Sequence, residues 1–348
     1  MKIFLGRSLF KIGDIEYNYN KIIEIYDKSL NDGCDLLIFP EMCIVGFPIY
    51  NELSDKSFIK KSNNFVEKII DYTKKKRATI LLGCPYSIEE NISKDGIIQN
   101  AELYNSAILI DDSYINDVHN KTNINKNNLF NEYKYFDKDV ILNDISYEND
   151  NFDILIGDEI NENKNILFIK ERDTDFILCL DTELEQNIKA KQQQLSKIAK
   201  WTKKNIIYMN NLSYDIKMGH RFLGDVFVLN HIGEIVYLNQ NNNEDILKFE
   251  THIENGILNI KNINKNINKK CNFIDIIAKN YTDKKIIFET NKYIDFKEKN
   301  IIQITFDKNI KDDKIIFIDL NNYIKNIKIT NEIKKIILQN IYKNSIII

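Results

Sequence analysis

Three side-chain types that together can support covalent catalysis lie at or near the ends of predicted strands. Glu41 follows an apolar run that a proline ends, Lys121 follows a strand candidate, and Cys179 lies near the end of another apolar run. A carboxylate can act as a general base, an ammonium group can stabilise an oxyanion, and a thiolate can attack a carbonyl carbon. Each residue alone also has an ordinary explanation, as a strand-end carboxylate, a surface lysine or a core cysteine. Their meaning depends on the elements that would bring them together.

The first half of the chain alternates between apolar runs and helical patterns. Strands are predicted at 2–5, 35–39, 78–82, 103–110 and 114–120, and helices at 18–31 and 65–76. The run DLLIF at 35–39 is continuously apolar, as expected of a strand in a parallel sheet that is buried on both faces. Strands that alternate with helices predict a mostly parallel sheet with helical crossovers.

The second half of the chain repeats this alternation and then loses its regularity. Strands are predicted at 152–156, 175–180 and 205–210, helices at 161–172 and 185–204, and a hairpin at 227–230 and 234–238. Further strand-like runs follow at 284–288, 300–306 and 314–320, after a polar, low-complexity segment at 261–270 that suggests a linker or an insertion. The sequence therefore predicts an α/β protein with a large domain over 1–255 and a small α/β extension over 256–348.

Composition excludes several classes of function. The formal net charge is −3, which argues against a nucleic-acid tether and against a polybasic membrane contact. No apolar run approaches the roughly 18 residues that a membrane-spanning helix needs, and the N-terminal segment lacks the apolar region of a signal peptide. Five scattered cysteines and four separated histidines suit a reducing cytosol and do not form a zinc-binding pattern. We expect a cytoplasmic protein that has no metal, no cofactor, no nucleic-acid partner and no membrane association.

Two segments carry a resemblance to a known family. The sequence LLIFPEMCIVGFP at 36–48 resembles the first signature of the nitrilase superfamily, the carbon–nitrogen hydrolases. Its continuation is similar to the amino-terminal glutaminase domain of glutamine-dependent NAD synthetase. The second signature is similar to KTNINKNNLFNEYKYF at 121–136, and Tyr104 and Asn105 match a family element that precedes it. The resemblance covers about residues 1–255.

The resemblance implies a fold and roles for named residues. The fold would be an αββα sandwich of the nitrilase type, whose sheets pair with a second subunit in the family. Glu41 would be the general base, Lys121 the catalytic lysine that stabilises the oxyanion, and Glu132 the second glutamate. A cysteine would complete the site as the nucleophile that attacks the amide of glutamine.

Two positions compete for that nucleophile. Gly157 follows Lys121 by 36 residues and Cys179 follows it by 58, and the shorter interval matches the family. Placing the nucleophile at Cys179 would leave out one helix and one strand before the strand at 205–210, which a parallel sheet cannot omit. The family register therefore assigns the nucleophile position to Gly157, which has no side chain, and Cys179 to the core.

The same register implies other departures from the family. Glu183 and Leu184 replace the serine and proline of an N-A-S-P element. The segment LGDVF at 223–227 corresponds to a D-G-x-S-F element of the family, and only Gly224 and Phe227 match it, so its first aspartate and its serine are missing. No glycine follows Gly256, which argues against a glycine-rich pyrophosphate loop in residues 257–348.

The leading hypothesis is a degenerate glutaminase-like domain that is catalytically silent. It would persist as a structural remnant, as a ligand-binding remnant for a small amide such as glutamine, or as a decaying gene product. One alternative is an active amide hydrolase that releases ammonia from glutamine for NAD synthesis and uses Cys179 in a rearranged site. Another is a non-catalytic interaction module that binds a complete synthetase or another nitrilase-fold subunit. In either case we expect a homo-oligomer or an assembly with a nitrilase-fold partner.

Overall fold

The structure is a computed structural model of the 348-residue chain. It describes residues 1–88, 102–124, 130–147, 150–215, 219–240, 243–254, 257–263, 273–282, 285–290, 302–305 and 315–319. The chain divides into two compact units, the first made of 1–214 and 221–267 and the second of 215–220 and 268–348.

One sheet of the first unit has seven strands, in the order β15-β14-β1-β2-β3-β4-β5. These strands are β1 Lys2–Arg7, β2 Leu36–Ile38, β3 Thr79–Ile88, β4 Glu102–Asp111, β5 Tyr114–Asn120, β14 Asp245–Glu254 and β15 Ile257–Asn262. β1, β2 and β3 are parallel to one another, and the remaining pairs are antiparallel. The predicted parallel crossover pattern therefore forms the centre of this sheet, and antiparallel strands extend it on both sides.

The other sheet of the first unit has six strands, in the order β13-β12-β9-β8-β7-β6. These strands are β6 Asp144–Tyr147, β7 Asp150–Ile156, β8 Phe176–Asp181, β9 Asn205–Asn210, β12 Val226–Leu229 and β13 Ile235–Asn239. β7, β8 and β9 are parallel, so their carboxyl ends meet at the same edge. A separate two-stranded sheet pairs β10 Leu212–Asp215 with β11 His220–Leu223.

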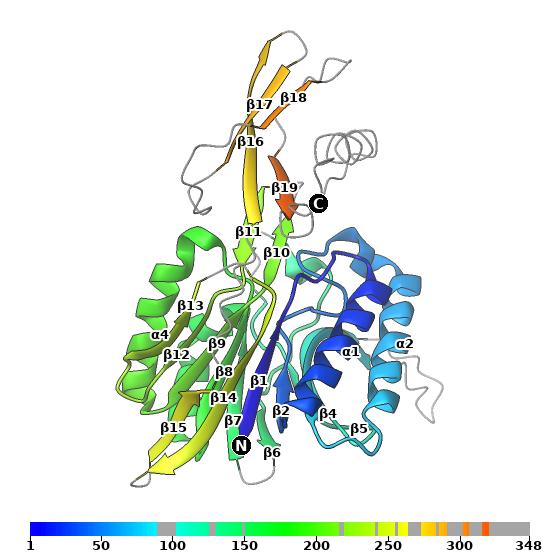
Figure 1. The fold of residues 1–348 in the computed structure, drawn as a ribbon. Coiled ribbons are helices and arrows are strands. Elements are labelled where there is room, and N and C mark those ends of the chain that lie inside the picture. Colours follow the sequence, from blue (N-terminus) through cyan, green and yellow to red (C-terminus); the bar gives the residue numbers. More distant parts are fainter. Residues whose placement is uncertain are drawn as a thin grey trace. The chain divides into compact units, whose positions relative to one another are not determined.

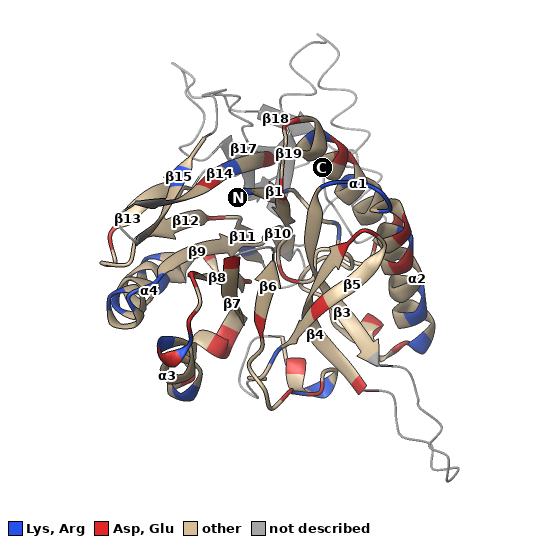
Figure 2. Cartoon of the chain, turned by 90° about the horizontal axis from the view of Figure 1, so that it is seen from below, with Lys and Arg blue, Asp and Glu red and all other residues tan. Residues whose placement is uncertain are grey.

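Helices cover the outer face of each sheet (Figure 1). α1 Ile15–Asn31 and α2 Lys56–Tyr72 lie beside the seven-stranded sheet, and α3 Asn163–Glu171 and α4 Ile188–Thr202 lie beside the six-stranded sheet. Seen from below, the charged residues lie mainly on the helices, whereas the strands between them are mostly uncharged (Figure 2). Short 3-10 helices, η1 Asn51–Ser54, η2 Glu132–Lys134, η3 Gly157–Asn161 and η4 Glu185–Asn187, complete this unit.

Three apolar cores hold these layers together. The inner faces of the two sheets share one core, to which Ile38 and Leu109 contribute from the first sheet and Ile154 and Leu178 from the second. The other two cores lie under α1 and α2 and under α3 and α4. Each fully buried aliphatic side chain contributes roughly 1.5–3 kcal/mol of burial free energy, which favours this stacking over separate sheets. The predicted αββα sandwich is confirmed.

Several predicted boundaries need correction. α2 begins at Lys56 rather than at residue 65, because the carboxylate of Asp55 accepts a hydrogen bond from Ser57 N and caps the helix before its apolar residues begin. The helix predicted at 185–204 is a 3-10 turn, η4, followed by the shorter α4, and the helix predicted at 161–172 is α3 alone, which follows the 3-10 helix η3. The polar residues of these first turns fit either kind of helix, and sequence pattern alone does not separate them.

The second unit contains a four-stranded antiparallel sheet in the order β18-β17-β16-β19. These strands are β16 Phe273–Thr282, β17 Lys285–Thr290, β18 Ile302–Thr305 and β19 Ile315–Asp319. β17, β18 and β19 coincide with the strand-like runs predicted at 284–288, 300–306 and 314–320, whereas β16 is not among the predicted strands. The helical part of the predicted α/β extension is not assigned to particular residues. The domain boundary at residue 255 stays a prediction, and β15 continues the seven-stranded sheet beyond it.

Candidate active site

Glu41 lies in the turn that follows β2, and its carboxylate is buried. Oε1 accepts hydrogen bonds from Asn105 Nδ2 at 2.6 Å and from Lys121 Nζ at 3.2 Å. Asn211 Nδ2 donates to the main-chain oxygen of Glu41 at 2.8 Å, which fixes the turn itself. A β-carbon at position 83 of β3 would collide with Pro40 O, so a glycine there lets β3 lie against this turn. The local sequence thus delivers one carboxylate into the interior.

Lys121 and Glu132 complete a buried charged triad with Glu41. Lys121 follows β5, and its backbone N–H donates to Asn105 O at 2.8 Å. Its Nζ lies 2.9 Å from Glu132 Oε2 and 3.2 Å from Glu41 Oε1, and all three side chains are almost fully excluded from solvent. Asn105 Nδ2 also donates to Glu132 Oε1 at 3.1 Å. The three residues singled out from the sequence are therefore brought together.

The members of the triad differ in their protonation behaviour. Burial raises the pKa of Glu41 to about 7, because the attraction of Lys121 is offset by repulsion from Glu132 and Asp181. Burial lowers the pKa of Lys121, but the two carboxylates outweigh it and hold that pKa well above its ordinary value. Lys121 is therefore a permanent cation, and Glu41 is a carboxylate that can take up a proton near neutral pH. Glu41 Oε2 is buried and has no hydrogen-bond partner within the described part of the chain.

Gly157 lies directly against this triad. It ends β7 and begins η3, with a left-handed backbone φ of +53°. A β-carbon built on Gly157 would lie 2.8 Å from Lys121 Nζ and 3.7 Å from Glu41 Oε2. A sharp strand-to-helix turn with strained backbone is how α/β enzymes expose a nucleophile. A side chain at position 157 would therefore begin beside Lys121 and point toward the triad.

Glu159, which the sequence reading did not single out, anchors this turn. Its buried carboxylate accepts hydrogen bonds from Ile156 N at 2.6 Å, Thr122 N at 2.6 Å and Thr122 Oγ1 at 2.7 Å. His119 Nε2 lies 2.8 Å from Glu159 Oε2, and both side chains are fully buried. Glu159 thus ties the turn that holds Gly157 to the segment that holds Lys121. The sequence signal available was an acid two residues after the strand-to-turn junction.

The alternative nucleophile, Cys179, lies in an apolar core. It pairs in register with Leu155, two residues before Gly157, and its side chain belongs to the core under α3 and α4 together with Tyr208. Burial raises the pKa of the Cys179 thiol well above its ordinary value, which keeps the thiol protonated and unreactive. The structure brings Gly157, not Cys179, to Glu41 and Lys121.

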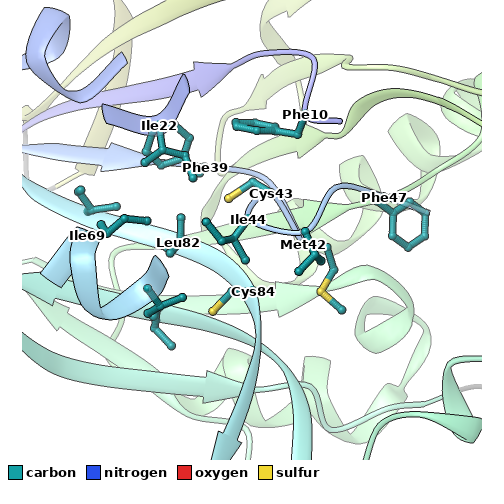
Figure 3. Close-up of a cluster of buried hydrophobic side chains, with 14 of the residues drawn as sticks. Phe10, Ile22, Phe39, Met42, Cys43, Ile44, Phe47, Ile69, Leu82 and Cys84 are labelled. Carbon is teal, nitrogen blue, oxygen red and sulfur yellow. The ribbon is translucent and has the colours of Figure 1, made fainter. Parts of the chain in front are cut away.

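The other described cysteines are also core residues. Cys34, Cys43 and Cys84 belong to the apolar cluster under α1 and α2, and Figure 3 shows Cys43 and Cys84 among the aromatic and aliphatic side chains of that cluster. Cys271 lies outside the described residues. Within the described residues, no group of three or more His, Cys, Asp and Glu side chains could hold a metal ion, and no helix is long and apolar enough to cross a membrane.

Aromatic side chains from three segments pack against one another in the same apolar cluster. The ring of Phe47 lies 4.5 Å from that of Phe130 and 5.4 Å from that of Phe222, measured between centroids. Leu184, at the predicted N-A-S-P element, is buried in this cluster as well. Glu183 lies in the loop between β8 and η4, where its side chain is partly buried.

Comparison with known proteins gives one family. Residues 5–196 match the carbon–nitrogen hydrolase family. The chain is 23% identical over 255 residues to the glutamine-dependent NAD(+) synthetase of Acinetobacter baylyi, a match that covers 73% of this chain and 44% of that protein. It is 26% identical over 136 residues to the corresponding Thermotoga maritima protein, covering 39% of this chain and 22% of that protein. The chain spans less than half the length of these relatives.

Solved structures agree in fold. The glutamine-dependent NAD+ synthetase of Acinetobacter baumannii has a TM-score of 0.62 and 25% identity, covering 74% of this chain and 46% of that one. An amidase from Nesterenkonia has a TM-score of 0.58 and 14% identity, covering 71% of this chain and 89% of that one. Together with the family match over more than half of the sequence, they show that this chain belongs to the carbon–nitrogen hydrolase family.

Proposed function

We propose that this chain is a catalytically silent glutaminase-like domain that binds a primary carboxamide such as glutamine without hydrolysing it. The observation that carries the proposal is the position of Gly157. A side chain at this residue would begin 2.8 Å from the Lys121 ammonium and 3.7 Å from Glu41 Oε2, yet glycine supplies none.

The chemistry of the site explains why hydrolysis would fail. Covalent amide hydrolysis needs an attacking atom, a base for its proton and a donor for the oxyanion. Glu41 can serve as the base and Lys121 as the oxyanion donor, but no thioester can form at Gly157. The described cysteines are buried in apolar cores, and burial raises the pKa of each thiol, which keeps the thiols protonated.

The same groups remain suited to binding an amide. Lys121 Nζ can donate to a carboxamide oxygen, and Glu41 Oε2, which has no partner among the described residues, can accept from a carboxamide N–H. A primary carboxamide therefore satisfies both groups at once and removes the free-energy cost of a buried unpaired acceptor. The relatives named glutamine-dependent NAD(+) synthetase support glutamine as one such ligand.

An ammonia-release assay on the purified full chain tests the proposal. With glutamine as substrate, we expect ammonia production no faster than in buffer, for the wild type and for Cys179→Ala alike. Glutamine-dependent ammonia release by the wild type would contradict the silent assignment. If Cys179→Ala abolished that release, Cys179 would be the nucleophile of an active hydrolase.

A further inference from the structure

A second charged cluster, formed by Asp181, Glu183 and Lys191, adjoins the triad at the carboxyl edge of the six-stranded sheet. Ile156 at the end of β7 pairs in register with Leu180 of the neighbouring strand β8. The next residues along the chain, Gly157 and Asp181, therefore lie at the same edge of the sheet. Asn211 connects the two clusters, because its backbone N–H donates to Asp181 O at 3.0 Å. As described above, the side chain of Asn211 holds the main-chain oxygen of Glu41.

Lys191 is fully engaged by the two acids of this cluster. Its Nζ lies 3.0 Å from Asp181 Oδ2 and 3.3 Å from Glu183 Oε2, and its side chain is 6% exposed. Tyr208 Oη donates to the same Asp181 oxygen at 3.2 Å. Burial lowers the pKa of Lys191, but Asp181 and Glu183 outweigh it and hold that pKa well above its ordinary value. Lys191 is therefore a cation whose charge is already balanced.

Glu183 is held rigidly in this position. Its backbone N–H donates to Asn210 Oδ1 at 2.9 Å, and Asn210 Nδ2 donates to its backbone oxygen at 2.8 Å. The second carboxylate oxygen of Glu183 accepts from Asn187 Nδ2 at 2.8 Å and from Leu184 N at 3.1 Å. Rotation of the Glu183 side chain away from Lys191 would break the ion pair and the two hydrogen bonds to its other carboxylate oxygen, so a ligand cannot displace it at low cost.

The surroundings of Gly157 consequently carry excess negative charge. Among the described residues, two lysines, Lys121 and Lys191, share this region with five acids, Glu41, Glu132, Asp158, Asp181 and Glu183. Burial raises the pKa of Asp158, next to Gly157, and Lys121, Asp181 and Lys191 all act on it, which places these charges in one field. A ligand carboxylate entering this field would lose its hydration, and both of these described lysines are already paired with acids.

We propose that Glu183, by occupying Lys191, sets the ligand preference of the site, so that primary carboxamides without a free carboxylate bind more tightly than glutamine itself. The inference rests on the proposed carboxamide binding and specifies what surrounds the amide group. Carboxamides that are neutral or carry an ammonium group are not repelled by this negative charge. Free glutamine carries an α-carboxylate, which would be repelled because the nearby lysines are already paired with acids. Specificity would arise from repulsion as much as from attraction.

Isothermal titration calorimetry of the full chain tests the inference with two probes. One probe is L-glutamine and the other is L-glutamine amide, in which a carboxamide replaces the α-carboxylate. We expect the wild type to bind the amide more tightly by about tenfold, a difference of roughly 1.4 kcal/mol. Glu183→Gln releases Lys191 from one acid, so it should tighten glutamine binding and reduce the preference by about the same factor.

The matched control is Glu171→Gln, which changes an exposed acid at the end of α3 and should leave the preference unchanged. Circular dichroism verifies the fold of each variant, and Glu183→Ser serves as a second variant. The inference is overturned if the wild type binds glutamine as tightly as the amide, or if both Glu183 variants keep the wild-type preference. Binding of neither probe to the wild type overturns the proposed function itself.

Discussion

At the scale of single residues, Gly157 combines a left-handed backbone with a position against the charged triad. Its φ of +53° is unstrained in glycine and costs other residues about 1–2 kcal/mol. Enzymes tolerate such strain where their chemistry depends on it. The proposed function uses no thiol at this position, so glycine avoids that cost.

The pH dependence of stability should report on Glu41. Its pKa is raised to about 7 in the folded protein, so its favourable contribution is complete below its unfolded pKa and is lost as pH rises through 7. Relative to Glu41→Gln, the wild type should lose about 1–3 kcal/mol of unfolding free energy between pH 4.5 and 7.5. Urea unfolding at several pH values measures this, and Glu67→Gln, on the exposed face of α2, is the control. A pH-independent difference between wild type and Glu41→Gln would rule out the raised pKa.

Part of the site could be predicted from the sequence because some of its residues lie in short motifs at fixed spacings. Glu41, Lys121, Glu132 and Gly157 follow from motif spacing, and the structure brings them together. Asn211 could not be found in this way, because its contact with Glu41 joins residues 170 positions apart in the sequence. Such contacts depend on how two sheets stack, and a single sequence does not encode that stacking in any local pattern.

At the scale of elements, the turn between β7 and η3 is the part that positions the site. Glu159 fixes it through four contacts to three residues, Thr122, Ile156 and His119. Burial raises the pKa of Glu159, but His119 and the N–H donors outweigh it and lower that pKa, so the acid is a carboxylate in the folded protein. A single acid thus sets the distance between Gly157 and Lys121.

Replacing Glu159 by Gln should therefore be costly. The new amide NH2 would face backbone N–H donors in a buried setting, and we expect a loss of about 2–4 kcal/mol in the free energy of unfolding at pH 7. A carboxylate whose pKa is lowered by folding stabilises the protein only while it is ionised, and this stabilisation is lost as pH falls through that pKa. The difference in unfolding free energy between wild type and Glu159→Gln should therefore shrink toward pH 3. Glu171→Gln, at the exposed end of α3, should stay within about 0.5 kcal/mol of wild type. A similarly small effect for Glu159→Gln in urea unfolding would refute its anchoring role.

At the scale of the whole molecule, alternation in the sequence predicted the layers but not every strand. The apolar runs of β2, β7, β8 and β9 predicted the parallel centres of the two sheets. β14 was missed, because charged residues interrupt its apolar positions and its partner β1 lies more than 200 residues away. Long-range antiparallel additions of this kind are set by tertiary packing rather than by local propensity.

The most direct test of the account is the reactivity of Gly157→Cys toward iodoacetamide, followed by peptide-resolved mass spectrometry. The new β-carbon would lie 2.8 Å from Lys121 Nζ and 3.7 Å from Glu41 Oε2, so Lys121 Nζ must shift to admit it, and the ammonium should stabilise a thiolate. Gly13→Cys, with φ +75° and no atom within 4 Å of its β-carbon, is the matched control. We predict that the thiol at 157 is alkylated about tenfold faster at pH 7 than the thiol at 13, and that Lys121→Met removes this advantage. Equal alkylation rates at the two positions would contradict the assignment of Gly157 as the vacated nucleophile position.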